Sequence, residues 1–436
     1  MGTARKGRGQ AGAVATKAGA RIQERWLRNG LQVLFAERHD DPVVAVLLLY
    51  RVGARDETER EAGLSHFLEH MMFKGSGSFG KGEVDLVATI LGGQINAFTS
   101  SDHTAYWFEF ASDRWEKALE IEADRMRGLL LDPAEFEAEK AVVLEELAMG
   151  EDDPWRSLTR KLKLALFARH PYRRPVIGYA DTLRVLGVED MRDYRARFYR
   201  PGNAILVVCG DFEPSSAIRA IRKHFGAIAR GASPAPLDRP RPPLTEPSGE
   251  QRIETHWDDT SRRLCMAWPT VRVGSDEDYA LDLVSVVLTS GRLSRLHRRL
   301  VIDEALATSV STSNDTRVEA GVFWLFAECA EGVEPARLES ALEAEIERLA
   351  RELVPASELK RARAILAAGE AYECETVTDL AEDLGEFAVD ADWRLALQSN
   401  ERLAAVRARD LRDVARRFLT RGRRVVGWSL PRAEER

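Results

Sequence analysis

The sequence predicts an α+β protein made of two homologous repeats, each a mainly antiparallel sheet packed against segregated helices. One observation is an internal repeat, in which the segment 190–206 recurs at 410–426 with a constant offset of 220 residues. Each copy has the pattern of a polar helix, a glycine turn and an apolar strand. A second match, Arg51-Val-Gly53 with Arg272-Val-Gly274, lies at an offset of 221. Two matches at nearly one offset indicate a duplication.

A proline-rich break separates the two copies. Six of the 17 prolines fall within residues 230–249, a composition typical of a stiff, extended linker. We therefore expect one domain at 24–229 and a homologous domain at 250–436. Residues 1–23 are basic, rich in Ala and Gly, and contain no acidic residue, which predicts a disordered tail. A transit peptide would have a similar composition.

Residue patterns predict the elements of the first half. Apolar periodicity and glycine positions mark helices, and runs rich in aromatic and β-branched residues mark strands. In chain order we expect paired strands at 30–36 and 43–51, helices at 62–73 and 83–91, a hairpin of strands at 94–99 and 104–110, and helices at 115–130 and 133–149. This order favours antiparallel strands with segregated helices over a strictly alternating βαβ arrangement.

The composition of the 436 residues is that of an ordinary globular protein, with 44% hydrophobic and 31% charged residues. A net charge of −7 argues against nucleic acid as the main partner. The four cysteines are too few and too scattered for a disulfide framework or a cysteine zinc site. The longest apolar runs are strand-sized, so no membrane span is expected. Without a secretory signal we expect a cytoplasmic protein, although the basic N-terminus leaves an organelle address open.

One motif predicts a metal site. His66 and His70 are four residues apart on a predicted helix, so their imidazoles lie one turn apart on one face. Two nitrogen ligands need this spacing to share a zinc ion. Glu69 lies at the edge of the same face, where it can act as a general base toward water. The chain has only eight histidines, and His-x-x-Glu-His would arise by chance in roughly one such chain in a hundred.

A catalytic zinc site needs a third protein ligand and an open position. Glu139 and Glu146 lie on the helix predicted at 133–149 and are seven residues apart, so they share one face. Glu145 points about 100° away from them. The sequence alone does not show that this face meets the histidine helix, because acidic helix faces are usually solvated.

The motif and its surroundings resemble the pitrilysin/insulysin family of zinc peptidases, the inverzincins. The likeness is to the short-chain branch, which includes the mitochondrial processing peptidase β-subunit and bacterial relatives. It spans about residues 24–430. The segments that carry it are Gly63–Gly75, Gly92-Gly93, Asn96–Thr99, Thr104–Tyr106, Glu139 with Glu146, Asp152–Pro154 and His170–Gly178.

This resemblance assigns roles to the acidic and histidine residues. It implies that His66, His70 and Glu146 bind one zinc ion per chain. It also implies that Glu69 is the general base that shuttles the proton during metal-assisted peptide hydrolysis. Glu139 would orient one of the ligands.

The resemblance also implies a peptide-binding edge. An extended substrate would add to a strand near Asn96, Ala97 and Phe98 by main-chain hydrogen bonds. Such a substrate must be short or unfolded, because strand addition requires free main-chain groups. For Asn96, a simple turn residue is the alternative interpretation.

The second half departs from the family pattern. It has no His-x-x-Glu-His, and many relatives carry there an Arg and a Tyr, seven residues apart, that stabilise the oxyanion. Val301 and Thr308 occupy the matching positions and neither can do this, although Arg298 or Arg299 could substitute if the register slips. We therefore expect a heterodimer in which a homologous partner without the zinc motif supplies the Arg/Tyr pair.

The expected function is that of a zinc metalloendopeptidase for oligopeptides or unfolded segments, acting as the catalytic subunit of this heterodimer. An alternative is a peptidase that processes leader segments or presequences, which predicts a single cut rather than broad cleavage. A third, different class is an inactive structural or assembly subunit. The intact metal motif argues against the third class, because a structural subunit has no use for an open zinc site.

Overall fold

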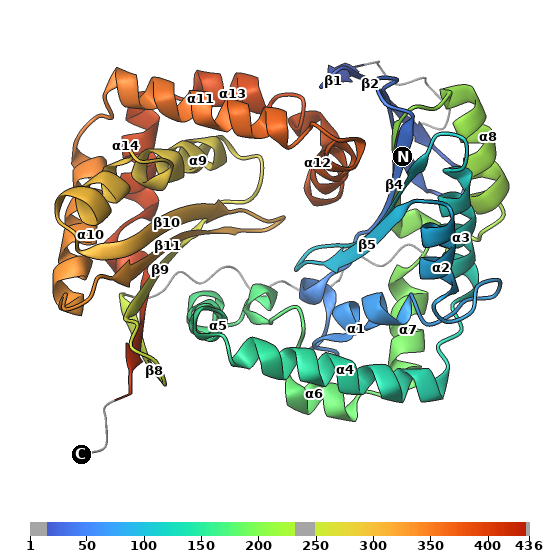
Figure 1. The fold of residues 1–436 in the computed structure, drawn as a ribbon, viewed down its shortest axis with the longest axis horizontal. Helices are drawn as coiled ribbons and strands as arrows, with labels where there is room; N and C mark the ends of the chain where they lie inside the picture. Colours follow the sequence, from blue (N-terminus) through green and yellow to red (C-terminus); the bar gives the residue numbers. More distant parts are fainter. Residues whose placement is uncertain (1–14, 232–248, 433–436) are drawn as a thin grey trace, which may run out of the picture. The chain divides into compact units, whose positions relative to one another are not determined.

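A computed structural model describes residues 15–231 and 249–432 of the chain. These residues form two compact units. The described part of the first unit comprises residues 15–144, 176–231 and 371–397, and that of the second comprises residues 145–175, 249–370 and 398–432. Both units combine one sheet with several helices (Figure 1).

The first unit contains a seven-stranded sheet with the strand order β1-β2-β3-β7-β4-β6-β5. Its strands are β1 (Ala15–Lys17), β2 (Ala20–Trp26), β3 (Gln32–Glu37), β4 (Val43–Tyr50), β5 (Gln94–Thr99), β6 (Thr104–Ala111) and β7 (Ala204–Gly210). Its helices are α1 (Leu64–Met71), α2 (Glu83–Ile90), α3 (Glu116–Gly128), α6 (Ala180–Val185), α7 (Val188–Phe198), α8 (Pro214–Phe225) and α12 (Val377–Asp390). Helix α4 (Pro133–Glu151) begins in this unit and runs beyond its boundary at Leu144.

The second unit contains a five-stranded sheet with the order β10-β11-β9-β12-β8. Its strands are β8 (Gln251–Trp257), β9 (Arg263–Thr270), β10 (Ala307–Asp315), β11 (Gly321–Cys329) and β12 (Val425–Pro431). The helices around it are α5 (Pro154–Phe167), α9 (Asp276–Thr289), α10 (Pro335–Arg351), α11 (Ala356–Tyr372), α13 (Ser399–Ala405) and α14 (Ala408–Phe418). No helix in the described part of the chain has both the length and the apolar character needed to span a bilayer.

The two sheets repeat one topology. The order β3-β7-β4-β6-β5 in the first corresponds to β8-β12-β9-β11-β10 in the second. In each sheet the first pair of this series is parallel and the following pairs are antiparallel. Helices α7 and α14 begin at Val188 and Ala408, at the offset found in the sequence. The predicted α+β fold of two homologous repeats is therefore confirmed.

Each sheet is also covered by a helix from the other half of the sequence. Helix α12 packs on β4 and β7 of the first sheet, and α5 packs on β12 and β9 of the second. The compact units therefore interleave along the chain, whereas the predicted division into 24–229 and 250–436 follows the repeat. Residues 232–248 of the predicted linker lie outside the described residues.

Two local predictions were wrong. Strands β3 and β4 do not pair with each other, because β7 lies between them, parallel to β3 and antiparallel to β4. The predicted disordered tail, residues 1–23, includes β1 and the first four residues of β2, because these strands extend the sheet beyond β3. Ala20 and Ile22 of β2 are fully buried, which gives this short segment enough apolar contact to be ordered. Residues 1–14 of that tail lie outside the described residues.

Helix α5 packs so closely on β12 that adding one carbon atom to Gly427 should lower the stability of the protein. A Cβ atom on Gly427 of β12 would lie 2.3 Å from Leu162 Cδ1 and 2.9 Å from Leu158 Cδ1. We expect Gly427→Ala to destabilise the protein by about 1–3 kcal/mol through overpacking, measured by urea unfolding. Adding Leu162→Ala to this variant should restore part of the loss. Additive losses in the double variant would contradict this explanation.

A buried acidic pair in the second unit predicts a pH effect on stability. Asp278 and Asp282 lie one turn apart on α9, and the Asn314 amide donates to one oxygen of each, at 2.8 and 2.9 Å. Burial, with the neighbouring charge of Asp278, raises the pKa of Asp282 to about 7. The unfolded chain loses this proton near pH 4 and the folded chain near pH 7. Stability therefore falls as pH rises through this window and stays reduced above it.

We expect Asp282→Asn to remove the part of this dependence that comes from Asp282 and to leave that of Asp278, whose pKa burial also raises, because the amide is neutral and can still accept from Asn314. The variant should be more stable than the parent by about 1–3 kcal/mol at pH 8 and nearly equal to it below pH 4, by urea unfolding. Asp276→Asn on the same helix, where the side chain is 99% exposed, is the matched control. Equal unfolding midpoints of Asp282→Asn and the parent at pH 8 would refute the assignment.

Candidate metal centre

The helix α1 presents the predicted motif on one face. Leu64, Phe67, Leu68 and Met71 are buried and hold the helix against the first unit, whereas the side chains at 66, 69 and 70 are only half-buried. Positions three and four apart share a face, so this packing turns both histidines and Glu69 in the same direction.

The start of α1 is fixed by a buried carboxylate. Glu57 accepts hydrogen bonds from the backbone N–H groups of Gly63 and Ser65, at 2.9 and 2.7 Å. These groups are among the unsatisfied donors of a helix N-terminus. Gly63 has a φ of 97°, and a Cβ there would lie 2.6 Å from the Ile177 carbonyl oxygen. Only glycine fits this position, which sets the rotation of the motif helix.

Three potential ligands come together. His66, His70 and Glu146 each offer one ligand atom, and these atoms all lie within 4.8 Å of one another. The imidazole rings have centroids 4.7 Å apart. Two imidazole nitrogens and a carboxylate oxygen are a donor set that zinc accepts in catalytic sites, so these residues fit the metal. Glu145, the neighbour of Glu146, is not a member of the set.

Helix α4 supplies Glu146. It is one uninterrupted helix from Pro133 to Glu151, and Phe136 near its start packs on Phe67 of α1 with ring centroids 4.6 Å apart. Glu139, one turn further along, reaches His70. The residue patterns alone could not predict these contacts between α1 and α4.

Glu139 holds the ring of His70. Its carboxylate lies 2.9 Å from His70 Nδ1 and 2.5 Å from Lys74 Nζ. Burial alone would raise the pKa of Glu139, but the hydrogen bonds from Lys74 and His70 outweigh it and lower the pKa overall. An ionised Glu139 fixes the Nδ1–H tautomer and leaves Nε2 of His70 for a metal ion. Sequence reasoning missed Lys74, although it stands four residues after His70.

Glu69 is positioned by a strand residue. The Thr99 hydroxyl donates to Glu69 Oε2 at 2.5 Å. Thr99 ends β5, so the proposed base is tied to the neighbouring strand as well as to its own helix. This residue was also missed, because no local pattern relates the end of one strand to a helix thirty residues earlier.

The face of α1 that carries Glu69 and His70 borders a cavity of about 300 Å³. Strand β5 is the edge of the first sheet and forms part of the cavity wall. The lining residues are Glu69, His70, Phe73, Lys74, Asp85, Ile95, Asn96, Ala97 and Glu139. The predicted substrate-binding residues Asn96 and Ala97 therefore lie at the cavity. Phe98 does not line the cavity; it packs against the core of the first unit, with its ring 5.7 Å from that of His103.

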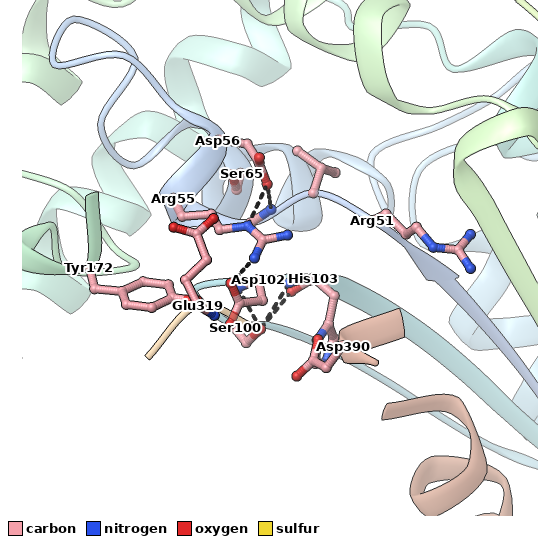
Figure 2. A network of polar contacts seen from close by, with 12 residues as sticks. Arg51, Arg55, Asp56, Ser65, Ser100, Asp102, His103, Tyr172, Glu319 and Asp390 are labelled. Carbon is pink, nitrogen blue, oxygen red and sulfur yellow. Dashed lines mark hydrogen bonds and ion pairs between the residues drawn. The ribbon is translucent and has the colours of Figure 1, made fainter. Parts of the chain in front are cut away.

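The turn after β5 is anchored by two ion pairs (Figure 2). Arg55 lies 2.7 Å from Asp102, and His103 lies 3.0 Å from Asp390 of α12. Burial alone would lower the pKa of His103, but the hydrogen bond and charge of Asp390 raise it overall. The Ser100 hydroxyl closes the turn, because its oxygen accepts hydrogen bonds from the backbone N–H groups of Asp102 and His103. This network fixes the edge strand that borders the cavity.

The fold and the site together define a two-repeat α+β protein of the metallopeptidase class. Residues 32–179 match the family described as Insulinase (Peptidase family M16), and residues 186–366 match the family described as Peptidase M16 inactive domain. Together these matches cover more than half of the sequence, and the chain belongs to peptidase family M16. The predicted resemblance is confirmed.

Named relatives agree with this assignment. The zinc protease PqqE of Helicobacter pylori is 28% identical over 90% of this chain and 89% of its own length. The uncharacterized zinc protease YmxG of Bacillus subtilis is 28% identical over 69% of this chain and 71% of its own. The crystal structure of a protease from Helicobacter pylori matches with a TM-score of 0.88 and 25% identity, over 94% of this chain and 100% of that chain.

A more distant structure shows the same fold. It is described as the peptidase M16 inactive domain from Pseudomonas fluorescens, and it matches with a TM-score of 0.86 at 17% identity, over 95% of this chain and 99% of that one.

Proposed function

We propose that this chain is a zinc-dependent metalloendopeptidase that hydrolyses peptide bonds in oligopeptides or unfolded segments. The observation that carries the proposal is the gathering of His66, His70 and Glu146 around one point, with Glu69 on the same helix face. Membership of family M16 and the zinc protease names of its relatives support it. One zinc ion per chain is proposed, because the described residues contain a single such group of three.

A zinc ion bound by these three residues supplies Lewis-acid activation of water and of the scissile carbonyl. Glu69 accepts the proton of the attacking water and returns it to the leaving amine. Thr99 donates to one oxygen of that carboxylate at 2.5 Å, which ties the base to the end of β5 and limits its rotation. Glu139 holds the His70 ring while this happens.

An extended peptide is the proposed substrate conformation. Among the described strands, β5 pairs with β6 alone, so its other edge can hydrogen-bond a further strand. Asn96 and Ala97 border the cavity beside Glu69 and His70. A peptide added here places its main chain next to the metal-binding face.

We also propose that catalysis requires a homologous partner subunit. By the family resemblance, Thr308 and Val301 stand where many relatives have Tyr and Arg. Of these two side chains only the Thr308 hydroxyl is a donor, and it donates to the Glu328 main-chain oxygen at 3.5 Å. The two arginines that could substitute are engaged locally: Arg299 Nε lies 2.7 Å from Glu304, and Arg298 Nε lies 3.6 Å from Asp303. A partner lacking the zinc motif would supply the oxyanion-stabilising Arg and Tyr.

Cleavage of a mixed set of unfolded peptides tests both proposals. We expect the purified chain to bind zinc but to cleave the peptides poorly when it is alone. Once a homologous subunit without the motif is added, it should cleave many unrelated peptides. Full activity of the chain alone would refute the partner requirement and support the peptidase. No cleavage in either state would refute the peptidase, and a single cut in one precursor would favour a processing enzyme.

A further inference from the structure

One charged group at the cavity has no role in the proposed reaction. Asp85, in the first turn of α2, lines the cavity that borders Glu69 and His70. Its side chain is exposed. Among the described residues no hydrogen bond or ion pair reaches its carboxylate, and its main-chain oxygen accepts from the Thr89 hydroxyl, so the carboxylate is available to a ligand.

The other charged side chains of the cavity are either paired with each other or have a role in the proposed reaction. Lys74 is paired with Glu139 at 2.5 Å, and Glu139 also holds His70. Glu69 is held by Thr99 for proton transfer. With three protein ligands, of which only Glu146 is charged, a zinc ion is nearly balanced by the two carboxylates at 69 and 146. The negative charge of Asp85 is therefore not balanced by the zinc ion or by Lys74.

Charged neighbours on and before α2 do not compensate Asp85. Lys81 pairs with Glu135 of α4 at 2.7 Å, and the Glu83 carboxylate accepts from the backbone N–H of Gly80 at 2.8 Å. In the described part of the chain, the cavity therefore presents the Asp85 carboxylate on its α2 side without a cation paired to it.

The remaining walls suit an aliphatic stem. Phe73, Ile95 and Ala97 are apolar and line the same cavity. A volume of about 300 Å³ is at the small end of ligand sites and holds one substrate side chain rather than a larger molecule. Lysine and arginine combine an apolar stem with a cationic end, which matches apolar walls that end in a carboxylate.

We propose that Asp85 makes this pocket select a lysine or arginine side chain next to the scissile bond of the substrate. The proposal rests on the proposed peptidase function, because the pocket starts at Glu69 and at the His70 ligand. Since Asp85 is exposed, its attraction is screened by water, and we expect a preference of about three- to fivefold over an uncharged side chain.

Peptide binding tests this without requiring catalysis. The Glu69→Gln chain is titrated with fluorescent unfolded peptides that differ only in carrying Lys, Arg, Leu or Glu at one scanned position, with and without zinc. We expect Lys and Arg peptides to bind about three- to fivefold tighter than the Leu peptide at one position, with the advantage falling as salt increases. Asp85→Asn, added to this chain, should abolish the advantage.

Two further variants make the result specific. Asp113→Asn removes the same charge from an exposed residue that does not line the cavity, and it should keep the advantage. Asp85→Lys should favour the Glu peptide, a gain that a misfolded protein would not show. The proposal is overturned if no peptide binds, if no position favours Lys and Arg, or if Asp85→Asn retains the preference.

This result is separable from that for the proposed function. If the parent cleaves Lys, Leu and Glu peptides with equal kcat/KM, the peptidase stands and the role of Asp85 falls. If zinc binding and cleavage both fail while the Asp85-dependent preference persists, the pocket stands and the peptidase falls.

Discussion

Replacing Glu69 by Gln lowers kcat for peptide hydrolysis by about 10²- to 10⁴-fold, because an amide cannot accept the proton of the attacking water. The exchange keeps the size of the side chain and an oxygen that can still accept from Thr99. The helix and the residues at 66, 70 and 146 stay unchanged, so the zinc content should equal that of the parent. The rate is measured in whichever state cleaves peptides, the chain alone or with its partner subunit.

Zinc content and thermal unfolding are the controls for this variant. Both should match the parent, and KM should change little because the exchange keeps the size of the side chain and its bond from Thr99. Activity within fivefold of the parent would show that another group takes the proton. A loss of zinc would mean that residue 69 holds the metal rather than the proton.

Replacing Glu146 by Gln is the second large effect, because it removes the one charged ligand of the proposed set. We expect zinc affinity, measured against a competing chelator, to fall by more than the roughly 10- to 100-fold typical of residues that only orient a ligand. Activity should be lost with the metal. Glu139→Gln should fall within that smaller range, because Glu139 contacts His70 and Lys74 rather than belonging to the set.

Glu145→Gln is the matched control for this series. It has the same chemistry, lies one residue away on the same exposed stretch of α4, and points about 100° from Glu146. Its zinc affinity should stay within about twofold of the parent, an expectation for a charge that belongs to no site. Equal losses for the two variants would contradict the assignment of Glu146 and indicate a general effect of acidic charge.

Much of the motif helix could be predicted from local spacing. A four-residue separation places His66 and His70 on one face of any α-helix, and their rings indeed lie 4.7 Å apart. The hairpin of β5 and β6 followed from the composition of its two strands in the same way. The repeat could also be found early, because duplicated segments keep their residue patterns and both sheets keep one topology.

Contacts between distant segments were beyond such reasoning. Predicting that β3 and β4 pair was reasonable for consecutive strands, yet β7 enters between them from more than 150 residues later. Thr99 lies thirty residues from Glu69 and had no signal of its own. Phe98 was expected near the substrate, and the structure shows that it packs against the core of the first unit and does not line the cavity.

The sequence by itself determined the repeat, the α+β class and the face that carries His66, Glu69 and His70. These follow from backbone periodicity, which every helix and strand obeys whatever it packs against. Only the tertiary structure decided that the α4 face of Glu139 and Glu146 meets the histidine helix, with Glu146 beside the histidines and Glu139 in contact with His70. That choice depends on the packing of Phe67 on Phe136, a contact whose free energy comes from burial and not from any local pattern.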